Sequence, residues 1–327
     1  MNKIRTAVVG VGYLGKFHAE KLAALPHSRL IAVCDTNPQQ CQHIAGQFKV
    51  QAVHDYRELI GQVDAVSIVV PTSIHYEVAK LFLENKIHVL LEKPITTTVA
   101  QAEHLIRIAN ESQVVFQIGH LERFNSVINA VGKILDGPQF IESIRTAPFK
   151  LRATDVNVIL DVMIHDIDII QNIVASPITS IQANGASVLT DQIDIANARI
   201  QFANGCVANV TASRVSVKMQ RILRIFQHNA YFAVDLQDKT LAIHRKGEGE
   251  MFPGIPEIIR DEQQFEANDA LKDEIAAFLH SITHNTPPIV SGEDGKRALV
   301  TAMEIVNIVG KQPFIKMGDK KPLPITE

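Results

Sequence analysis

The stretch Val8–Ala19 has the sequence VVGVGYLGKFHA. Its three glycines stand in the spacing GxGxxG, at Gly10, Gly12 and Gly15. An apolar run, Ile4–Val9, precedes the glycines and an apolar-periodic segment, Tyr13–Leu25, follows them, which predicts a strand, a tight turn and a helix. In that context the glycines allow the turn and let the backbone approach a pyrophosphate, whose charge faces the N–H groups at the helix start. The stretch therefore predicts a dinucleotide-binding unit.

The second apolar run of the chain ends in Asp35, about twenty residues beyond the last glycine. A carboxylate there accepts hydrogen bonds from a ribose 2′-hydroxyl and repels a 2′-phosphate. Thr36 and Asn37 follow, so no arginine stands ready for that phosphate. We therefore predict NAD rather than NADP, with an α/β domain that leaves its nucleotide cleft empty as the alternative.

The first 121 residues alternate short apolar runs with helical segments. We expect strands at Ile4–Val9, Leu30–Cys34, Ala65–Val70, His88–Leu91 and Val114–Ile118. We expect helices at Tyr13–Leu25, Gln39–Phe48, His75–Glu84 and Val99–Glu111. Strands that are apolar throughout and linked by helices indicate a parallel sheet covered on both faces. The predicted fold class is α/β, with residues 1–121 as a Rossmann domain.

Residues 122–327 follow a different pattern. Alternating runs predict strands at Ile178–Val188, Ile193–Phe202, Cys206–Arg214, Arg221–Gln227, Ala230–Leu236 and Thr240–His244. Helices are expected at Asp161–Val174, Ala270–His284 and Gly295–Val309. The Asn204–Gly205 dipeptide favours a hairpin between two of the strands. These features predict a substrate-binding α+β domain with a large open, mainly antiparallel sheet, whose free face we expect to make a homodimer or homotetramer.

Composition excludes several classes of protein. Among 327 residues, 46% are hydrophobic and the formal net charge is −3, with both signs dispersed, which argues against nucleic acid and acidic membranes as partners. No apolar run approaches the roughly 18–20 residues of a membrane span. The three cysteines lack metal-ligand spacing, so we expect no metal and a reducing, cytoplasmic location.

The run Leu91-Glu92-Lys93-Pro94 ends a predicted strand of the parallel sheet. Proline cannot donate a ladder hydrogen bond, so the chain turns at Pro94. Lys93 then projects from the carboxyl edge of the sheet, where ligands bind in such folds. The alternative is an ordinary surface lysine.

Residues Ile159–Ile170 have the sequence ILDVMIHDIDII. On an α-helix the spacing of four residues puts Asp161 and His165 on one face, one turn apart. Ionisable groups in apolar surroundings cost free energy unless they are paired or used. The two side chains are therefore either a satisfied structural pair or part of a reactive site.

These motifs occur in an order that resembles the Gfo/Idh/MocA family of nicotinamide-dependent dehydrogenases, and the resemblance covers essentially the whole chain. It implies hydride transfer at a hydroxyl carbon of a sugar or cyclitol, with Lys93, Asp161 and His165 around the reacting hydroxyl. It also implies the cofactor contacts, which we place at Gly10, Gly12, Tyr13, Leu14, Gly15, Asp35, Pro71, Thr72, His75, Glu92 and Lys93. The family usually has glycine where this chain has Met163, which narrows the space beside the helix.

The three catalytic candidates suit the oxidation of a secondary alcohol. A base must remove the hydroxyl proton as hydride leaves, and histidine, with an unperturbed pKa of about 6.5, is a natural choice. Asp161 orients the imidazole of His165 or binds a neighbouring hydroxyl. Lys93 stabilises a developing alkoxide if it is cationic, and acts as the base if its pKa is depressed. The sequence leaves the choice between Lys93 and His165 open.

A narrower resemblance points to the substrate. The segment GHLERFN, residues 119–125, together with LDVMIHDID resembles the branch of the family that oxidises UDP-N-acetylglucosamine at C3 for lipid A diamino sugars. Candidate substrate contacts are Arg123, Asn125, Asp155 and Asn157. For Arg123 an ion pair between the domains is the alternative. The competing functions are a cyclitol or free-sugar dehydrogenase and a non-catalytic NAD-binding regulator.

Overall fold

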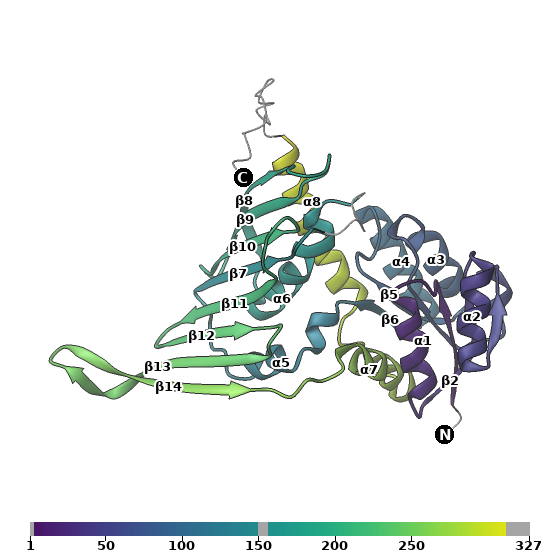
Figure 1. The fold of residues 1–327 in the computed structure, drawn as a ribbon, viewed down its shortest axis with the longest axis horizontal. Helices are drawn as coiled ribbons and strands as arrows, with labels where there is room; N and C mark the ends of the chain where they lie inside the picture. The colour runs from purple at the N-terminus through teal and green to yellow at the C-terminus, as the bar shows by residue number, and fades with distance from the viewer. Residues whose placement is uncertain (1–2, 150–155, 312–327) are drawn as a thin grey trace, which may run out of the picture.

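The computed structural model describes residues 3–149 and 156–311 and contains two β-sheets (Figure 1). The first is a six-stranded sheet in the order β3-β2-β1-β4-β5-β6, and all its neighbouring pairs are parallel. Its strands are β1 Ile4–Val9, β2 Ser28–Cys34, β3 Gln51–Val53, β4 Ala65–Ile68, β5 His88–Glu92 and β6 Phe116–Gly119. This order, reversing between β1 and β4, is that of a Rossmann sheet and confirms the predicted α/β class.

Helices cover both faces of this sheet. On one side lie α3 (His75–Glu84) and α4 (Val99–Ser112), whose buried faces carry residues such as Phe82 and Leu105. On the other side lie α1 (Gly15–Ala24) and α2 (Pro38–Phe48). β4 and β6 are buried along their whole length and β1, β2 and β5 along most of it, because each face of the sheet meets a helical layer. The sequence missed β3, which has only three residues.

The second sheet has eight strands in the order β14-β13-β12-β11-β7-β10-β9-β8. They are β7 Phe140–Thr146, β8 Ile178–Ala186, β9 Ile195–Phe202, β10 Val207–Ser213, β11 Gln220–Gln227, β12 Ala230–Asp235, β13 Thr240–Phe252 and β14 Ile255–Gln264. All neighbours are antiparallel except the parallel pair of β7 with β10. The predicted antiparallel character is confirmed, but β7 and β14 were not predicted.

The predicted hairpin at Asn204–Gly205 is confirmed. Gly205 has a φ of +87°, which a side chain would disfavour, and Phe202 donates its N–H to the carbonyl of Cys206 at 2.9 Å. The turn joins β9 to β10 in antiparallel register.

Four helices belong to the C-terminal part of the chain: α5 Ser126–Gly132, α6 Ile164–Val174, α7 Ala270–His284 and α8 Gly292–Gly310. α6 and the second half of α8 pack on one face of the eight-stranded sheet, where Ile167, Ala302 and Ile305 are fully buried. α7 instead packs with α1 on the Rossmann sheet through Ile275 and Phe278. The polypeptide after residue 121 therefore contributes to both cores.

The helix expected at 161–174 differs from its prediction. It begins with a π-helical segment, Ile159–Met163, before continuing as α6. The side chain of Asn157 accepts hydrogen bonds from the backbone N–H groups of Ile159 and Leu160 at this start. Single π-turns often mark functional sites, because they shift a backbone carbonyl and re-aim side chains.

Within the ranges given above, none of the helices has the length and apolarity that a membrane span requires.

Candidate active site

The glycine-rich turn after β1 has the close contacts that its sequence predicts. Gly10 has a φ of +88°, and a Cβ on it would lie 2.6 Å from the carbonyl oxygen of Val69. A Cβ on Gly15 would lie 1.8 Å from the carbonyl oxygen of Gly10. Gly12, by contrast, faces open space, with no atom within 4 Å of its ideal Cβ. Gly10 and Gly15 therefore leave no room for a side chain, whereas Gly12 leaves the space that a pyrophosphate would occupy.

Asp35 links this turn to the end of β2. One carboxylate oxygen accepts the N–H of Val11 at 2.8 Å and the other accepts the N–H of Asn37 at 2.8 Å. Each oxygen retains a further lone pair for a ribose hydroxyl. α1 begins without a side-chain cap, and Tyr13 and Leu14 beside it are 65% and 50% exposed. This donor set and shape fit a dinucleotide, whose pyrophosphate the first turn of α1 would hold.

His75 has a structural position under the sheet edge. Its two ring nitrogens lie 2.9 Å from the carbonyl oxygens of Val70 and Pro94, so the ring bridges the turns after β4 and β5. The side chain is buried, and burial lowers its pKa. Pro71, in the same turn, is exposed, and Thr72 is half-buried.

Glu92, at the end of β5, points into the domain. Its carboxylate lies 3.2 Å from Nε2 of the buried His18, whose Nδ1 is 2.7 Å from Oγ of Ser67. Burial opposes ionisation of Glu92, but the hydrogen bond and charge of His18 outweigh it and lower the pKa. Glu92 also accepts the N–H of Lys93 at 3.2 Å, which supports the turn that presents the lysine.

Lys93 and Asp161 meet across the two halves of the chain. The Lys93 Nζ donates to the backbone carbonyl of Asp161 at 2.6 Å and to its Oδ1 at 3.3 Å. The lysine side chain is 15% exposed and the aspartate side chain 38%. Lys93 is therefore not an ordinary surface lysine, and it binds the carbonyl of the π-helical segment.

His165 lies one turn further along and is half-buried. Its Nδ1 is buried without a hydrogen-bond partner among the described residues, so a satisfied Asp161–His165 pair is not what the structure shows. Burial lowers the pKa of His165 well below its ordinary value, and the positive charge of Lys93 lowers it further. The ring is neutral at neutral pH, as a proton acceptor must be.

Three of the four candidate substrate contacts, Arg123, Asn125 and Asn157, hydrogen-bond to other parts of the protein. Arg123 is buried and pairs with Asp168 through Nε at 2.6 Å and Nη2 at 2.9 Å, which is the alternative that we gave for it. Asn125 is buried, caps α5 through the N–H of Val127, and donates to the carbonyl of Leu236. Asn157 caps the π-helical segment, as described above. Asp155 lies outside the described residues.

Two further polar groups near the site were missed from the sequence. His120, between Gly119 and the 3-10 turn Leu121–Phe124, is 1% exposed, and neither ring nitrogen has a hydrogen-bond partner among the residues that the structure describes. Burial lowers its pKa. Arg145 on β7 donates to Asp166 at 2.7 and 3.0 Å and to Glu122 at 2.7 Å. Arg145 occupies one of the alternate positions of β7 that face the core. A charged residue in phase with Ile141 was the feature of the sequence that could have indicated a buried arginine.

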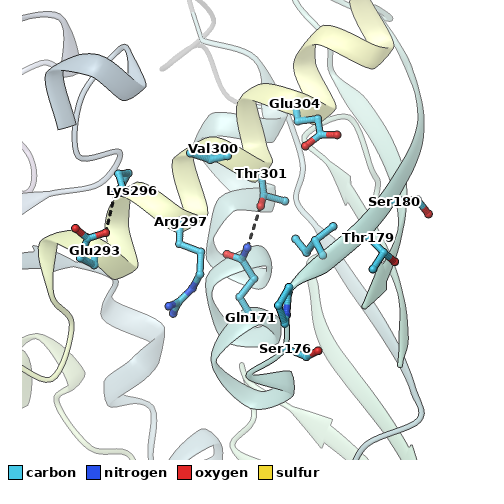
Figure 2. A pocket seen from close by; sticks show the side chains of 12 residues that line it. Gln171, Ser176, Thr179, Ser180, Glu293, Lys296, Arg297, Val300, Thr301 and Glu304 are labelled. Atoms are coloured by element: carbon cyan, nitrogen blue, oxygen red, sulfur yellow. Dashed lines mark hydrogen bonds and ion pairs between the residues drawn. The ribbon is translucent and has the colours of Figure 1, made fainter. Parts of the chain in front are cut away.

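A separate hollow of about 520 Å³ lies between the end of α6, the start of β8 and α8 (Figure 2). Its polar lining includes Gln171, Lys296 and Glu304, and Gln171 donates to Thr301 at 2.9 Å. None of the predicted site residues within 3–149 and 156–311 lines this hollow.

The fold and these groups define a two-domain oxidoreductase with an NAD-binding Rossmann domain. Family models match residues 4–120 as "Oxidoreductase family, NAD-binding Rossmann fold" and residues 139–231 as "GFO/IDH/MocA C-terminal domain". The chain belongs to the Gfo/Idh/MocA family of oxidoreductases, as its motifs indicated.

Individual relatives agree with this assignment. UDP-N-acetylglucosamine 3-dehydrogenase of Acidithiobacillus ferrooxidans is 38% identical over 306 residues, 93% of this chain and 97% of that protein. A solved structure of that dehydrogenase superimposes with a TM-score of 0.90, covering 94% of this chain and 98% of the other. Myo-inositol 2-dehydrogenase of Thermotoga maritima is 26% identical over 337 residues, 97% of this chain and 99% of that protein.

Proposed function

We propose that this protein is an NAD-dependent dehydrogenase that oxidises C3 of UDP-N-acetylglucosamine, in the synthesis of diamino sugars for lipid A. The observation that carries the proposal is the approach of Lys93 to Asp161 at 2.6–3.3 Å, beside a neutral His165 and at the edge of the Rossmann sheet. The choice of substrate is supported by the 38% identity to a UDP-N-acetylglucosamine 3-dehydrogenase over nearly the whole length of both chains.

The site residues divide the work of removing a proton from a hydroxyl. When bound, the nicotinamide supplies the hydride acceptor. His165, neutral and partly accessible, takes the hydroxyl proton. Lys93 donates a hydrogen bond to the substrate oxygen and stabilises its developing negative charge. Asp161 holds the Lys93 ammonium in place and offers its other carboxylate oxygen to a neighbouring sugar hydroxyl.

The preference for NAD over NADP rests on Asp35. Its carboxylate is already fixed by two backbone N–H groups, so it cannot swing away from a ribose 2′-phosphate. Gly10, Gly12 and Gly15 would form the pyrophosphate turn, with Tyr13 and Leu14 beside it.

Arg123 and Asn125 serve the substrate site by holding it in shape, through Asp168 and the start of α5. Asp155 and Asn157 lead into the catalytic segment and remain candidates for sugar contacts. The three cysteines are free and buried, which agrees with a reducing, cytoplasmic setting for the reaction.

The open face of the eight-stranded sheet is our candidate for subunit contact. An aromatic row crosses it, from Phe140 to Phe226 at 5.8 Å, to Tyr231 at 4.7 Å and to His244 at 5.4 Å between ring centroids. Aromatic side chains are enriched at protein interfaces. This agrees with the homodimer or homotetramer expected from the sequence.

Inositol oxidation is the second candidate, because a myo-inositol 2-dehydrogenase matches 97% of the chain at 26% identity. The test incubates the protein and NAD⁺ separately with UDP-N-acetylglucosamine, free N-acetylglucosamine and myo-inositol. NADH formation is followed by absorbance, and the nucleotide-sugar product by mass spectrometry with a transaminase present to capture the ketone. We expect turnover only with the UDP-sugar, and turnover with inositol alone would reverse the assignment.

A matched pair of variants tests the site itself. Lys93→Met should lower kcat by about 10²–10⁴-fold, the range of a lost proton-transfer or charge-stabilising group. Lys80→Met, which alters a lysine paired with Glu84 on the surface of α3, should leave kcat unchanged. A Lys93→Met protein with full turnover would remove the role given to that amine. Binding of NADH without turnover of any sugar by the unaltered protein would favour a regulator instead.

A further inference from the structure

The hairpin of β13 and β14 is much longer than the sheet that it belongs to. β12 pairs with β13 only from Thr240 to Arg245, whereas β13 continues to Phe252. Of the remaining seven residues, Lys246 still donates its N–H to the carbonyl of Asn229 at 3.0 Å, and the strand otherwise pairs with β14. At about 3.3 Å per residue, these residues extend roughly 20 Å beyond the sheet. Figure 1 shows this projection pointing away from the Rossmann domain. Residues 245–260 are called the arm below.

The arm exposes an unusual amount of apolar surface. Apart from Gly247 and Pro256, every residue of the arm is exposed. Its large apolar side chains have exposed fractions of 48–62%: Met251 54%, Phe252 62%, Ile255 52%, Ile258 48% and Ile259 48%. A two-stranded hairpin without a hydrophobic partner is marginally stable in water, so the arm needs a surface to pack against.

Both faces of the arm carry apolar residues. Ile258 and Ile259 are neighbours in β14, opposite Lys246 and Arg245 in the register, and adjacent strand residues point to opposite faces. The edge of β14 is unsuited to adding another strand, because Pro256 interrupts its row of donors. The partner therefore packs against the faces of the arm rather than against its edge.

The charges of the arm are sorted along its length. At the base, next to the sheet, stand Arg245, Lys246 and Arg260, with Arg245 3.9 Å from Asp261. Nearer the tip stand Glu248, Glu250 and Glu257. The arm thus has a basic base and an acidic tip. This arrangement is self-complementary when two arms lie antiparallel, because each acidic tip then meets the basic base of the other.

We propose that the arm packs against the arm of a second copy of this chain, antiparallel about a two-fold axis, with the apolar side chains between them. A two-fold axis brings the same patch of each copy together, and only an antiparallel arrangement satisfies the charge order. The contact adds a site of self-association distinct from the aromatic row on the open sheet face. It does not depend on which substrate the enzyme oxidises.

The test reverses the charge at one end of the arm in each of two variants of the full-length protein. The tip variant carries Glu248→Lys and Glu250→Lys, and the base variant carries Lys246→Glu and Arg260→Glu. Native mass is measured by sedimentation equilibrium over a concentration series, with circular dichroism to verify folding. A control variant, Glu103→Lys with Glu111→Lys, makes the same charge change as the tip variant on the exposed surface of α4.

We expect each arm variant alone to weaken self-association at least tenfold, whereas the control keeps the native mass. Mixing the tip and base variants should restore the native mass as a mixed complex, because the tip variant is then basic at both ends and the base variant acidic at both. A monomeric wild-type protein, arm variants that keep the native mass, or a mixture that does not reassociate would each overturn the proposal.

Discussion

A histidine acts as a base only while its ring is neutral, and two features keep His165 neutral. Burial disfavours the imidazolium, and the ammonium of Lys93 disfavours it further. The same lysine is held by the carbonyl and carboxylate of Asp161, so its charge stays where it acts on the ring. The two candidates that the sequence left open are therefore coupled, with the imidazole suited to accept the proton and the ammonium to bind the oxygen.

This coupling predicts a change in the titration of His165. In Lys93→Met the pKa of His165 should rise relative to the wild type, because one of the charges that lower it is gone, and it should stay below about 6.5 because burial remains. The measurement is an NMR titration of protein labelled with ¹³C-histidine, with the signal assigned through His165→Gln. Lys80→Met is the control. A signal that does not move in Lys93→Met would contradict the coupling.

A second residue-level prediction concerns Glu274 on α7. Within the described part of the chain, its buried carboxylate oxygens have no hydrogen-bond partner. Burial and, to a smaller extent, the charge of Glu92 raise the pKa of Glu274 well above the ordinary value. A raised folded-state pKa gives stability that is present below about pH 4.5 and is lost as the pH rises through the folded value. Glu274→Gln should therefore match the wild type at pH 5 and exceed it by about 1–3 kcal/mol at pH 9.

The measurement is urea unfolding followed by circular dichroism at the two pH values. Glu77→Gln, at an exposed position of α3, should show no such difference. An effect of Glu274→Gln that is equal at pH 5 and pH 9 would argue that the wild-type carboxyl is ionised in the folded protein throughout.

At the level of elements, the segment after β6 is held to α6 by buried charges. Glu122 and Arg123 sit in the turn, and Asp166 and Asp168 lie on the helix, with Arg145 of β7 between Glu122 and Asp166. These contacts place α6, which carries His165, relative to the Rossmann sheet. Asp166 pairs with Arg145 and Asp168 pairs with Arg123. Because the two aspartates are two residues apart, they lie on different sides of the helix, and α6 is held from both.

Arg145→Met should destabilise the protein by about 3–5 kcal/mol, because it removes the arginine that pairs with the buried Asp166 and leaves Glu122 with only Asn125 and the more distant Arg221. Arg224→Met, on the neighbouring β11, breaks a partly exposed pair with Glu142 and should cost less than about 1 kcal/mol. Urea unfolding of both variants separates the two cases. Equal losses would show that the buried network does not carry the stability assigned to it.

The elements found from the sequence are those with a strong local period or local turn chemistry. The Rossmann strands, the glycine turn and the Asn204–Gly205 hairpin belong to this group. β7 was missed because its buried polar positions, Ser143 and Arg145, interrupt the apolar alternation, and their partners lie far away in the sequence. The π-helical segment was missed because a lysine from another domain binds its carbonyl, which no local pattern records.

At the scale of the whole molecule, α8 joins the two cores. Its 19 residues span about 28 Å, and it contacts β6 and α4 at its start and α6 and β8 further along. Ideal Cβ atoms on Gly292 and Gly295 would lie 2.8 Å from Ile106 and Ile118. The glycines therefore allow the helix to approach the Rossmann sheet closely.

Gly295→Ala should destabilise the protein by about 1–3 kcal/mol, because the added methyl group meets Ile118 inside a packed core. The control is Gly46→Ala, in the last turn of α2, where an added Cβ has open space. That change should stabilise the protein by about 0.5–1 kcal/mol, the usual effect of replacing glycine in a helix. Thermal unfolding measures both, and a stabilised Gly295→Ala protein would mean that α8 can move away from β6.

The sequence predicted that Lys93 and Asp161 lie together, but it did not predict the contacts of the buried polar candidates. Lys93, Asp161 and the glycine turn follow from strand ends and helix spacing, which are local. The buried contacts of Arg123 and Asn125 are with Asp168 and Leu236, which lie 45 and 111 residues further along the chain, so no local pattern indicates them. The domain boundary drawn near residue 121 stays a prediction of where the first sheet ends.

The double anchorage of Asp35 has a consequence for attempts to retarget the enzyme to a different coenzyme. Exchanging this residue for a small or basic one, to admit the phosphorylated form, would also release the amides of Val11 and Asn37 that it now engages. Such a variant would change the specificity for the coenzyme and would also lose the hydrogen bonds that hold the glycine-rich turn to the end of β2. Asparagine at this position would keep one acceptor oxygen and could therefore hold only one of these two N–H groups.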